Sequence, residues 1–474
     1  MIKDWYEKTK LDLVPVMLLL LAAFMLYGKG LGQDFLENWD DHIYVTANPD
    51  IMGFTLENIR YAFTKEYVGN YAPLHIISYI LDYTLWGFNA LGFKLTNILL
   101  HATNAILYYA TLARITGRYR FALAAAAIFL CHPVQVESVV WISQRKNLLA
   151  MFFFLLSFLT YLSWREHRRF ALYALSLAAF TLSLLSKSAA VVLPLILICY
   201  DICFRERETL WRLVRDKLPY IGLAVTCSLV ALYTQEGSGR TGYLSGTPLI
   251  TLINMLPTFS RYLILLLVPA QLSIIYNEPI KTVLDTEVIL SALLVVILTI
   301  SWVYLYRQNR VIFFWCSLIP IGLLPVSNII PLVTLMNDRY LYFPMLGFAA
   351  IVAHLLISEP GIRPSRQLIP LRIVYCAVLL ALSAVTWKRV DVWQDSVTLW
   401  SDAVIKSRDG FRYGPDDNFI AGAYGEALHI LGYQAERCGS IQAARNYYLK
   451  ALAWDPLDPL SRVALNNLSG IYVK

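Results

Sequence analysis

Long apolar stretches alternate with short polar loops from the start of the chain to about residue 390. About 20 apolar residues in a row are enough to cross a bilayer as an α-helix. By this criterion the chain is expected to be an all-α, polytopic membrane protein. The pattern predicts about eleven spans, at residues 12–29, 91–113, 120–134, 147–164, 169–186, 188–204, 218–234, 285–305, 311–327, 340–358 and 371–388.

Two further apolar stretches, at 72–88 and 248–268, contain polar breaks. The first includes Pro73 and Asp82, and the second includes Arg261. Charged and aromatic residues within such stretches favour helices that lie in the plane of the membrane interface. We therefore predict two interfacial helices. If both crossed the membrane instead, the two chain ends would still lie on opposite sides.

The chain after residue 390 is more polar, and its apolar residues have helical spacing. A tetratricopeptide repeat needs small residues where its two helices touch and a proline after the second helix. The chain matches the repeat pattern at Leu431, Gly432, Gly439, Ala444, Tyr448, Ala451 and Pro456. We predict a membrane domain over 1–390 and a short repeat-like helical domain over 391–474. A generic helical cap is the alternative.

Composition and charge support this assignment and orient the chain. Hydrophobic residues make up 58% of the chain and charged residues 15%, against roughly 25% charged in soluble domains. The net charge of +7 comes from short basic clusters between apolar runs, the pattern of cytoplasmic loops rather than of a nucleic-acid partner. The N-terminus is then cytoplasmic and the C-terminus lies outside. The seven cysteines form no CxxC pair and indicate no redox compartment.

This topology collects acidic and basic residues at the ends of several spans on the outer face. Adjacent carboxylates such as Asp40 and Asp41 are costly near a membrane unless a cation or a shared proton compensates them. The candidate site residues are Asp40, Asp41, His42, His132, Glu137, Arg145, Lys146, Lys187, Arg261, Asp338 and Arg339.

The mixture of charges suits transfer of a sugar from a lipid-linked phosphate. Arginine and lysine can hold the phosphate, and a carboxylate can take the proton of the acceptor hydroxyl. Asp40 or Asp41 could also hold a divalent cation, Mg²⁺ or Mn²⁺, through its oxygens. The sequence contains no zinc-ligand spacing, Ser-His-Asp order or glycine-rich phosphate loop.

Each candidate also has a purely structural interpretation. The Asp pair could lie in a solvated turn, and His132 before Pro133 could simply end a helix. The basic pair Arg145 and Lys146 could anchor a span at the interface. Asp338 and Arg339 could form a local ion pair.

Six motifs follow one another in an order that spans the chain: Asn38-Trp39-Asp40-Asp41, Tyr71-Ala72-Pro73-Leu74, Trp86-Gly87-Phe88-Asn89, residues 92–101 (GFKLTNILLH), residues 132–138 (HPVQVES) and residues 338–344 (DRYLYFP). Together they resemble the transmembrane and tetratricopeptide-repeat O-mannosyltransferase family and its bacterial relatives among the GT-C glycosyltransferases. Each motif alone is weak, but the combination is specific.

The resemblance implies an inverting, multi-pass enzyme whose active site faces the periplasm or lumen. The donor would be a polyprenyl-phosphate-linked monosaccharide, mannose or another hexose, and Asp40 or Asp41 would be the base. The acceptor would be an exported protein, docked by the C-terminal tail. His132, Glu137, Arg145 and Arg339 fall at family motif positions.

The chain departs from the family in its short acidic motif and in Ala72-Pro73, where the family often has Arg-Pro. Its short repeat region favours an enzyme of the bacterial inner membrane, with the endoplasmic reticulum as the alternative. A glycolipid or polysaccharide acceptor is the closest rival interpretation. A non-enzymatic scaffold or a transporter is another, although transporters place polar residues near the membrane midplane rather than at span ends.

Overall fold

The computed structural model describes residues 13–36, 38–205, 209–237, 243, 246–276, 279–332, 334–357, 365–407, 418–454 and 458–471. Within these ranges the chain forms helices and no β-strand. The α-helices are α2 (Leu13–Tyr27), α3 (Leu56–Thr64), α4 (Pro73–Trp86), α5 (Ala90–Thr116), α6 (Tyr119–Cys131), α7 (Val136–Val140), α8 (Arg145–His167), α9 (Phe170–Ser186), α10 (Leu193–Phe204), α11 (Leu210–Arg215), α12 (Leu218–Gly237), α13 (Pro248–Leu267), α14 (Thr286–Gln308), α15 (Arg310–Leu323), α16 (Met345–Leu356), α17 (Ser365–Asp391), α18 (Ser396–Ser407), α19 (Asn418–Arg437), α20 (Ile441–Trp454) and α21 (Pro459–Ile471).

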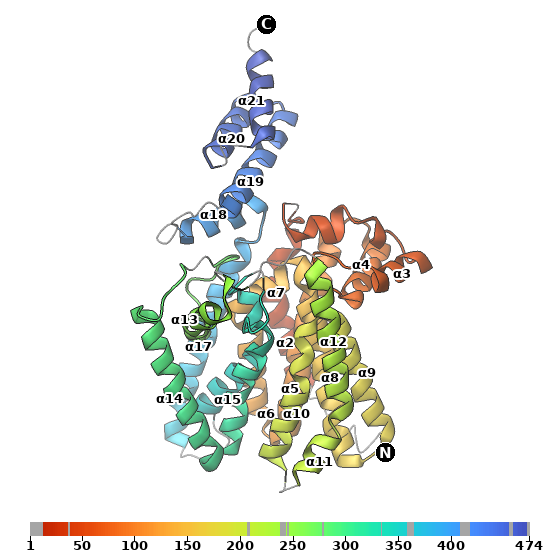
Figure 1. Cartoon of the computed structure of the whole chain (residues 1–474), viewed down its shortest axis with the longest axis vertical. Coiled ribbons are helices and arrows are strands. Elements are labelled where there is room, and N and C mark those ends of the chain that lie inside the picture. The colour runs from red at the N-terminus through yellow and green to blue at the C-terminus, as the bar shows by residue number, and fades with distance from the viewer. Residues whose placement is uncertain are drawn as a thin grey trace.

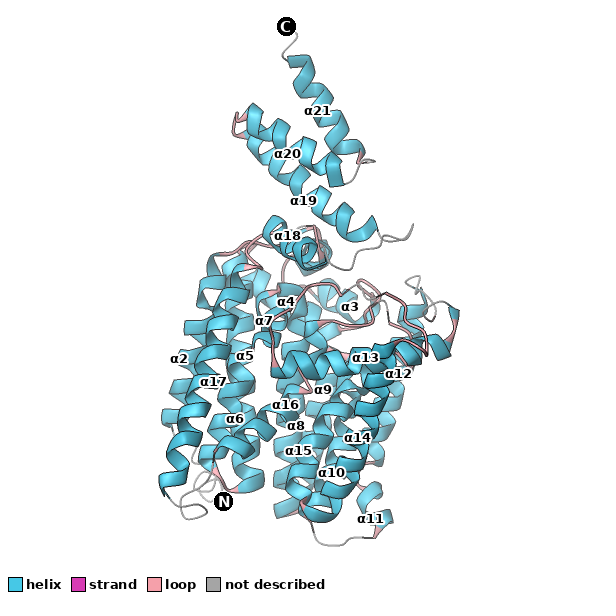
Figure 2. Ribbon diagram, turned by 90° about the vertical axis from the view of Figure 1, so that its left-hand side faces the viewer, coloured by secondary structure: helices cyan, strands magenta, loops and turns pink. Residues whose placement is uncertain are grey.

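Most helices before α18 form a bundle along the long axis of the molecule (Figures 1 and 2). The short helices α3, α4 and α7 gather at one end, and the C-terminal helices extend beyond it. Each of the eleven predicted spans overlaps a bundle helix. The all-helical, multi-pass architecture is therefore confirmed.

The number of membrane crossings stays a prediction. Among the described residues, five helices are long and apolar enough to span a membrane, and a sixth is added if the 56° bend between 119–131 and 133–140 lies within one span. Residues 248–267 form one of these five, although we predict an interfacial helix there. Figure 2 shows α13 lying crosswise over the end of the bundle, the orientation that the interfacial prediction requires.

Small residues hold the bundle helices together. The Ser157 hydroxyl on α8 donates to the Ser176 carbonyl on α9 (2.7 Å), and the Ser183 hydroxyl donates to the Ala150 carbonyl (2.6 Å). A Cβ atom at Gly347 on α16 would lie 2.5 Å from the carbonyl oxygen of Trp315 on α15. Because helices in a membrane associate through close backbone approach and polar contacts, these residues explain why the apolar segments pack in pairs.

Helix α18 packs with the bundle, whereas α20 and α21 form a cluster of their own. Trp393 and Trp400 are fully buried in the main hydrophobic core. Tyr448 packs separately with Ala444 and Leu468. The predicted boundary at residue 390 therefore precedes a helix that belongs structurally with the bundle.

The contact between α19 and α20 has the character expected of a repeat. A Cβ atom at Gly432 would lie 2.5 Å from the ring of Tyr448, so only glycine permits this approach. Ala444 and Ala451 are fully buried, while Pro456 lies outside the described residues. Assignment of the tail to the tetratricopeptide class stays a prediction.

The packing of α18 can be tested with Trp400→Ala. We expect this truncation to lower the free energy of unfolding by about 3–5 kcal/mol, the usual cost of removing a buried large aromatic residue. Thermal unfolding of the purified protein in detergent measures the effect. Trp211→Ala is the matched control, because Trp211 is 63% exposed. Equal melting temperatures for the two variants would contradict the packing described here.

Candidate active site at the outer end of the bundle

Asp41 is held by backbone and hydroxyl donors in the loop after α2. Its Oδ2 accepts from the Leu36 amide (3.1 Å), and its Oδ1 accepts from the Ser143 amide (3.0 Å) and the Ser143 hydroxyl. Burial raises the pKa of the Asp41 carboxyl, although these donors and the charge of Lys94 oppose the shift. Asp41 therefore ties the loop to the turn that leads into α8.

Asp40 has a different environment. Its side chain is partly exposed, and it has no hydrogen bond, and no ion pair within 4.0 Å, with any described residue. It lies close enough to Lys146 and Arg339 for its charge to act on both. The next residues, His42–Thr46, form a π-helical turn, an irregularity that is frequent at functional sites. Of the predicted pair, Asp40 is the carboxylate with free oxygens.

Three basic side chains from separate parts of the chain lie close together, and two of them, Lys146 and Arg339, lie near Asp40. Lys146 at the start of α8 donates to the Tyr44 hydroxyl (3.3 Å), and Lys187 donates to the Asn147 side-chain oxygen (2.5 Å). Burial and the charges of Lys146 and Arg339 lower the pKa of Lys187 well below its ordinary value. We call Lys146, Lys187 and Arg339 the cationic cluster. An anion bound here would relieve their mutual repulsion.

Glu137 positions the third member of this cluster. Its carboxylate accepts from the Arg339 guanidinium (2.5 Å) and from the Arg339 backbone amide (2.9 Å). The ion pair raises the pKa of Arg339 above its usual range. The Asn147 side chain also donates to the Arg339 carbonyl (3.3 Å). The turn carrying Arg339 is thus fixed on α7 and α8.

Asp338, the residue before Arg339, has contacts of its own. The Tyr276 hydroxyl donates to its carboxylate, and the Arg389 guanidinium at the end of α17 lies 4.0 Å away. Burial and the nearby charge of Glu137 raise the pKa of Asp338 to about 7. Arg389 also pairs with Asp402 on α18 (2.5 Å). These contacts connect α18 with the site.

Four tryptophans line the same region. Trp39, beside the Asp pair, stacks on Trp141 (centroids 5.8 Å apart), and Trp141 stacks on Trp393 (5.8 Å). Trp400 meets Trp39 edge to face at 5.1 Å. Sequence reasoning missed Trp141, Trp393 and Trp400 as site neighbours. Trp141 and Trp393 follow predicted spans, where tryptophan is enriched in membrane proteins, whereas Trp400 lies within α18.

Arg145 lies in the interior rather than on the outer face. It is fully buried and pairs with Asp82 on α4 (2.5 Å). It also donates to the Asn97 side chain (2.8 Å) and the Phe93 carbonyl (2.8 Å) on α5. These contacts lock α4 and α5 against the start of α8.

His132 and His42 lie apart from the cationic cluster. His132 is fully buried, and its Nε2 contacts the Leu266 carbonyl at the end of α13 (3.0 Å). Its Nδ1 accepts from the Val134 amide (3.4 Å), an arrangement that ends α6. His42 is exposed and contacts Thr46 (3.1 Å).

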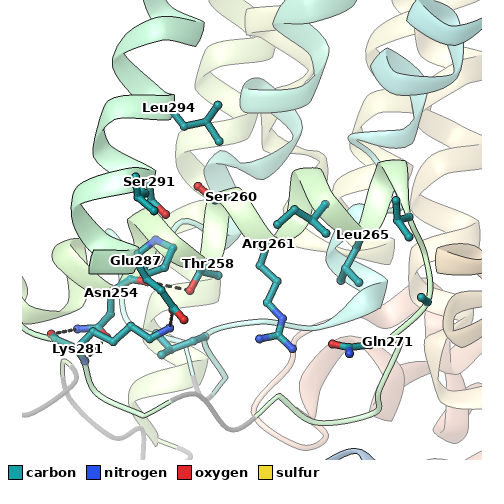
Figure 3. Close-up of a pocket in the computed structure, with 16 residues that line it drawn as sticks. Asn254, Thr258, Ser260, Arg261, Leu265, Gln271, Lys281, Glu287, Ser291 and Leu294 are labelled. Atoms are coloured by element: carbon teal, nitrogen blue, oxygen red, sulfur yellow. Dashed lines mark hydrogen bonds and ion pairs between the residues drawn. The ribbon is translucent and has the colours of Figure 1, made fainter. Parts of the chain in front are cut away.

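Arg261 lines a separate cavity of about 650 Å³ between α13 and α14. Figure 3 shows Arg261 and Gln271 near one another, with Ser291 and Leu294 across the cavity on α14. The Arg261 guanidinium lies 5.6 Å from the ring of Tyr276, which contacts Asp338. The cavity thus adjoins the turn that carries Arg339.

The residues present offer limited ligation to a metal ion. The described residues contain no group of three or more His, Cys, Asp or Glu side chains suited to a metal. Asp41 uses both carboxylate oxygens in hydrogen bonds, which leaves Asp40. Mg²⁺ is often held by one or two carboxylates together with substrate phosphates. Asp40 therefore fits as a single protein ligand and does not form a complete cage.

Comparisons with known proteins bear out the resemblance drawn from the motifs. Residues 73–235 match the family described as dolichyl-phosphate-mannose-protein mannosyltransferase. A protein O-mannosyl-transferase of Caenorhabditis elegans is 24% identical over 411 residues, which cover 82% of this chain and 57% of that protein. The Tmtc2 protein O-mannosyl-transferase of Drosophila melanogaster is 30% identical over 38% of this chain and 21% of its own length. This chain thus spans about half or less of these relatives.

Two solved membrane-protein matches have low overall similarity to this chain. The Archaeoglobus fulgidus oligosaccharyltransferase with a tethered acceptor peptide matches 89% of this chain and 59% of its own, with 12% identity and a TM-score of 0.44. ArnT from Cupriavidus metallidurans bound to undecaprenyl phosphate matches 96% and 77%, with 14% identity and a TM-score of 0.41. Both TM-scores are below 0.5, so the similarity of this chain to known proteins rests on the sequence matches. The chain is thus similar in sequence to the protein O-mannosyltransferases over these parts of its length.

The structural role of Arg145 generates a prediction. Arg145→Ala leaves Asp82 buried without its partner, and we expect a loss of about 3–5 kcal/mol in the free energy of unfolding. Thermal unfolding in detergent measures this loss. Arg60→Ala on α3, at the same end of the molecule, is the control because Arg60 is exposed. An unchanged melting temperature for Arg145→Ala would show that Arg145 is free to serve a ligand instead.

Proposed function

We propose that this protein is a membrane glycosyltransferase. It moves a monosaccharide, mannose or another hexose, from a polyprenyl-phosphate donor to an exported protein on the periplasmic or lumenal face. One observation carries the proposal: Asp40 has free carboxylate oxygens and lies beside the cationic cluster of Lys146, Lys187 and Arg339. The relatives named as protein O-mannosyl-transferases support the choice of sugar and acceptor.

In the proposed reaction the acceptor hydroxyl oxygen attacks the anomeric carbon of the donor sugar. Asp40 takes the hydroxyl proton as the new glycosidic bond forms. The bond from the anomeric carbon to the phosphate oxygen breaks, and its electron pair leaves with the polyprenyl phosphate. Attack opposite the leaving group inverts the anomeric carbon. The cationic cluster stabilises the negative charge that grows on the phosphate, as fixed cations do in other transferases.

Asp41 acts through the loop rather than on the substrate in this proposal. Its two carboxylate oxygens are occupied by Leu36 and Ser143, so it positions Asp40. If Asp40 instead held a bound Mg²⁺ or Mn²⁺, that ion would add positive charge at the donor phosphate.

The variants Asp40→Asn and Asp41→Asn distinguish the roles of the two carboxylates. We expect Asp40→Asn to lower kcat by about 10²–10⁴, the usual contribution of a general base, with an unchanged melting temperature. Asp41→Asn should lower the melting temperature as well, because an amide group then faces the Leu36 and Ser143 donors. Membranes with a radiolabelled polyprenyl-phosphate sugar provide the assay, and thermal unfolding the second readout.

Two results would overturn these assignments. Full activity of Asp40→Asn would remove Asp40 as the base. If the wild-type protein released no sugar from the lipid donor, the scaffold or transporter interpretation would replace the enzyme.

The cavity between α13 and α14 suits the prenyl chain of the donor. Its walls include Ile264, Leu290 and Leu294, and its charged lining residues are Arg261 and the ion pair of Lys281 with Glu287. Leu294→Trp should fill the cavity and raise KM for a long-chain donor several-fold, with little effect on a short-chain analogue. Leu293→Trp is the matched control, since Leu293 is the neighbouring residue and is 55% exposed. Equal effects on the two donors would place the chain elsewhere.

The tail is the feature that favours a protein acceptor, because stacked helices offer an extended surface for a peptide. Truncation after Gly410 removes α19–α21 and keeps α18, which packs in the bundle. We expect this variant to lose most transfer to the native exported protein and to keep transfer to a short hydroxyl acceptor. Mass spectrometry of exported proteins, read for a missing hexose, measures the first activity. Unchanged transfer would favour a glycolipid or polysaccharide acceptor.

We place the protein in the bacterial inner membrane, with the N-terminus cytoplasmic, and keep the endoplasmic reticulum as the alternative.

A further inference from the structure

A second cavity, of about 630 Å³, lies among α2, α6, α16 and α17. Apolar side chains such as Leu19, Leu123, Ala127 and Leu379 form most of its wall. Arg120 and Arg372 are the two charged residues that line it. None of the proposed site residues lines this cavity, so a ligand here would be separate from the donor and acceptor.

The cavity extends along the length of α6. Helix α6 contributes lining residues from Arg120 to Cys131, a stretch that corresponds to about 16 Å of helix. This length is about half of the roughly 30 Å hydrocarbon thickness of a bilayer. Because α6 ends just before His132, at the end of the bundle that carries the candidate site, Arg120 marks the opposite end. The cavity therefore has the depth of a single leaflet.

The two arginines are available to a ligand. Neither Arg120 nor Arg372 forms a hydrogen bond or an ion pair with any described residue. The Tyr375 hydroxyl donates to the Ala124 carbonyl (3.1 Å) and holds α17 against α6 at the cavity wall. The outer side of α17 is apolar and exposed, with Ile373 64% exposed, as expected for a helix that faces lipid. The groove is thus a formed apolar cleft with two free guanidinium groups.

We propose that this groove binds one anionic phospholipid of the leaflet opposite the candidate site. Its acyl chains would lie along α2, α6 and α17, and Arg120 and Arg372 would bind its phosphate. Arginine suits this role because its planar fork can make paired hydrogen bonds to phosphate oxygens. A zwitterionic lipid fits the apolar wall equally well but leaves a net positive charge at the rim.

Native mass spectrometry of the full-length protein in detergent tests the proposal. The delipidated protein is titrated with phosphatidylglycerol and with phosphatidylcholine of the same acyl chains. We expect wild type to bind one phosphatidylglycerol at least about tenfold more tightly than phosphatidylcholine, the factor that one charge-assisted hydrogen bond supplies. The double variant R120Q/R372Q should lose this preference. R307Q is the matched control, because Arg307 is an exposed arginine in the last turn of α14.

A second variant tests the shape of the groove without a change in charge. Ala127→Trp should weaken binding of both lipids, and its melting temperature shows whether it is folded. Equal affinity of wild type for the two lipids would overturn the proposal. So would a loss of preference in R307Q as large as in R120Q/R372Q, which would indicate general surface charge. A protein dimer that Ala127→Trp dissociates would instead assign the groove to a second copy of the chain.

Discussion

The hydrogen bonds of the turn that leads into α8 hold together the end of the bundle that carries the candidate site. Successive residues reach different parts of the chain: Ser143 donates to Asp41, Arg145 pairs with Asp82, and Lys146 donates to Tyr44. The next residue, Asn147, donates to the Arg339 carbonyl. Since a buried polar group that loses its partner costs free energy, none of these segments can move alone. The position of Asp40 relative to the cations follows from this one turn.

Two adjacent carboxylates acquire different roles because the turn contacts only one of them. Asp41 is buried and takes three donors, so it is part of the scaffold. Asp40 is partly exposed and keeps its oxygens free. Separation of neighbouring titratable groups by environment is a recurrent way to divide catalytic work. The cationic cluster beside Asp40 is the feature on which the proposed preference for a negatively charged donor rests.

The C-terminal part of the chain is divided by packing rather than by composition. Helix α18 is polar enough to resemble the tail, yet Trp400 and the Arg389–Asp402 ion pair join it to the end of the bundle. Helices α20 and α21 instead bury Tyr448 among their own residues. The first helix of the tail is therefore part of the bundle, and the later helices pack among themselves.

The sequence by itself determined the all-helical membrane class and the positions of the bundle helices. It also determined that an acidic loop, with Asp40 and Asp41, follows the first of these helices. Apolar length and charge clusters are local properties, so they can be read along the chain. The tertiary structure decided that Asp40 rather than Asp41 has free oxygens, and that Arg145 is an internal anchor. It also brought Lys146, Lys187 and Arg339 together and placed Trp141 and Trp393 beside them. Such contacts depend on how distant helices pack, and no local pattern records which face of a helix meets which neighbour.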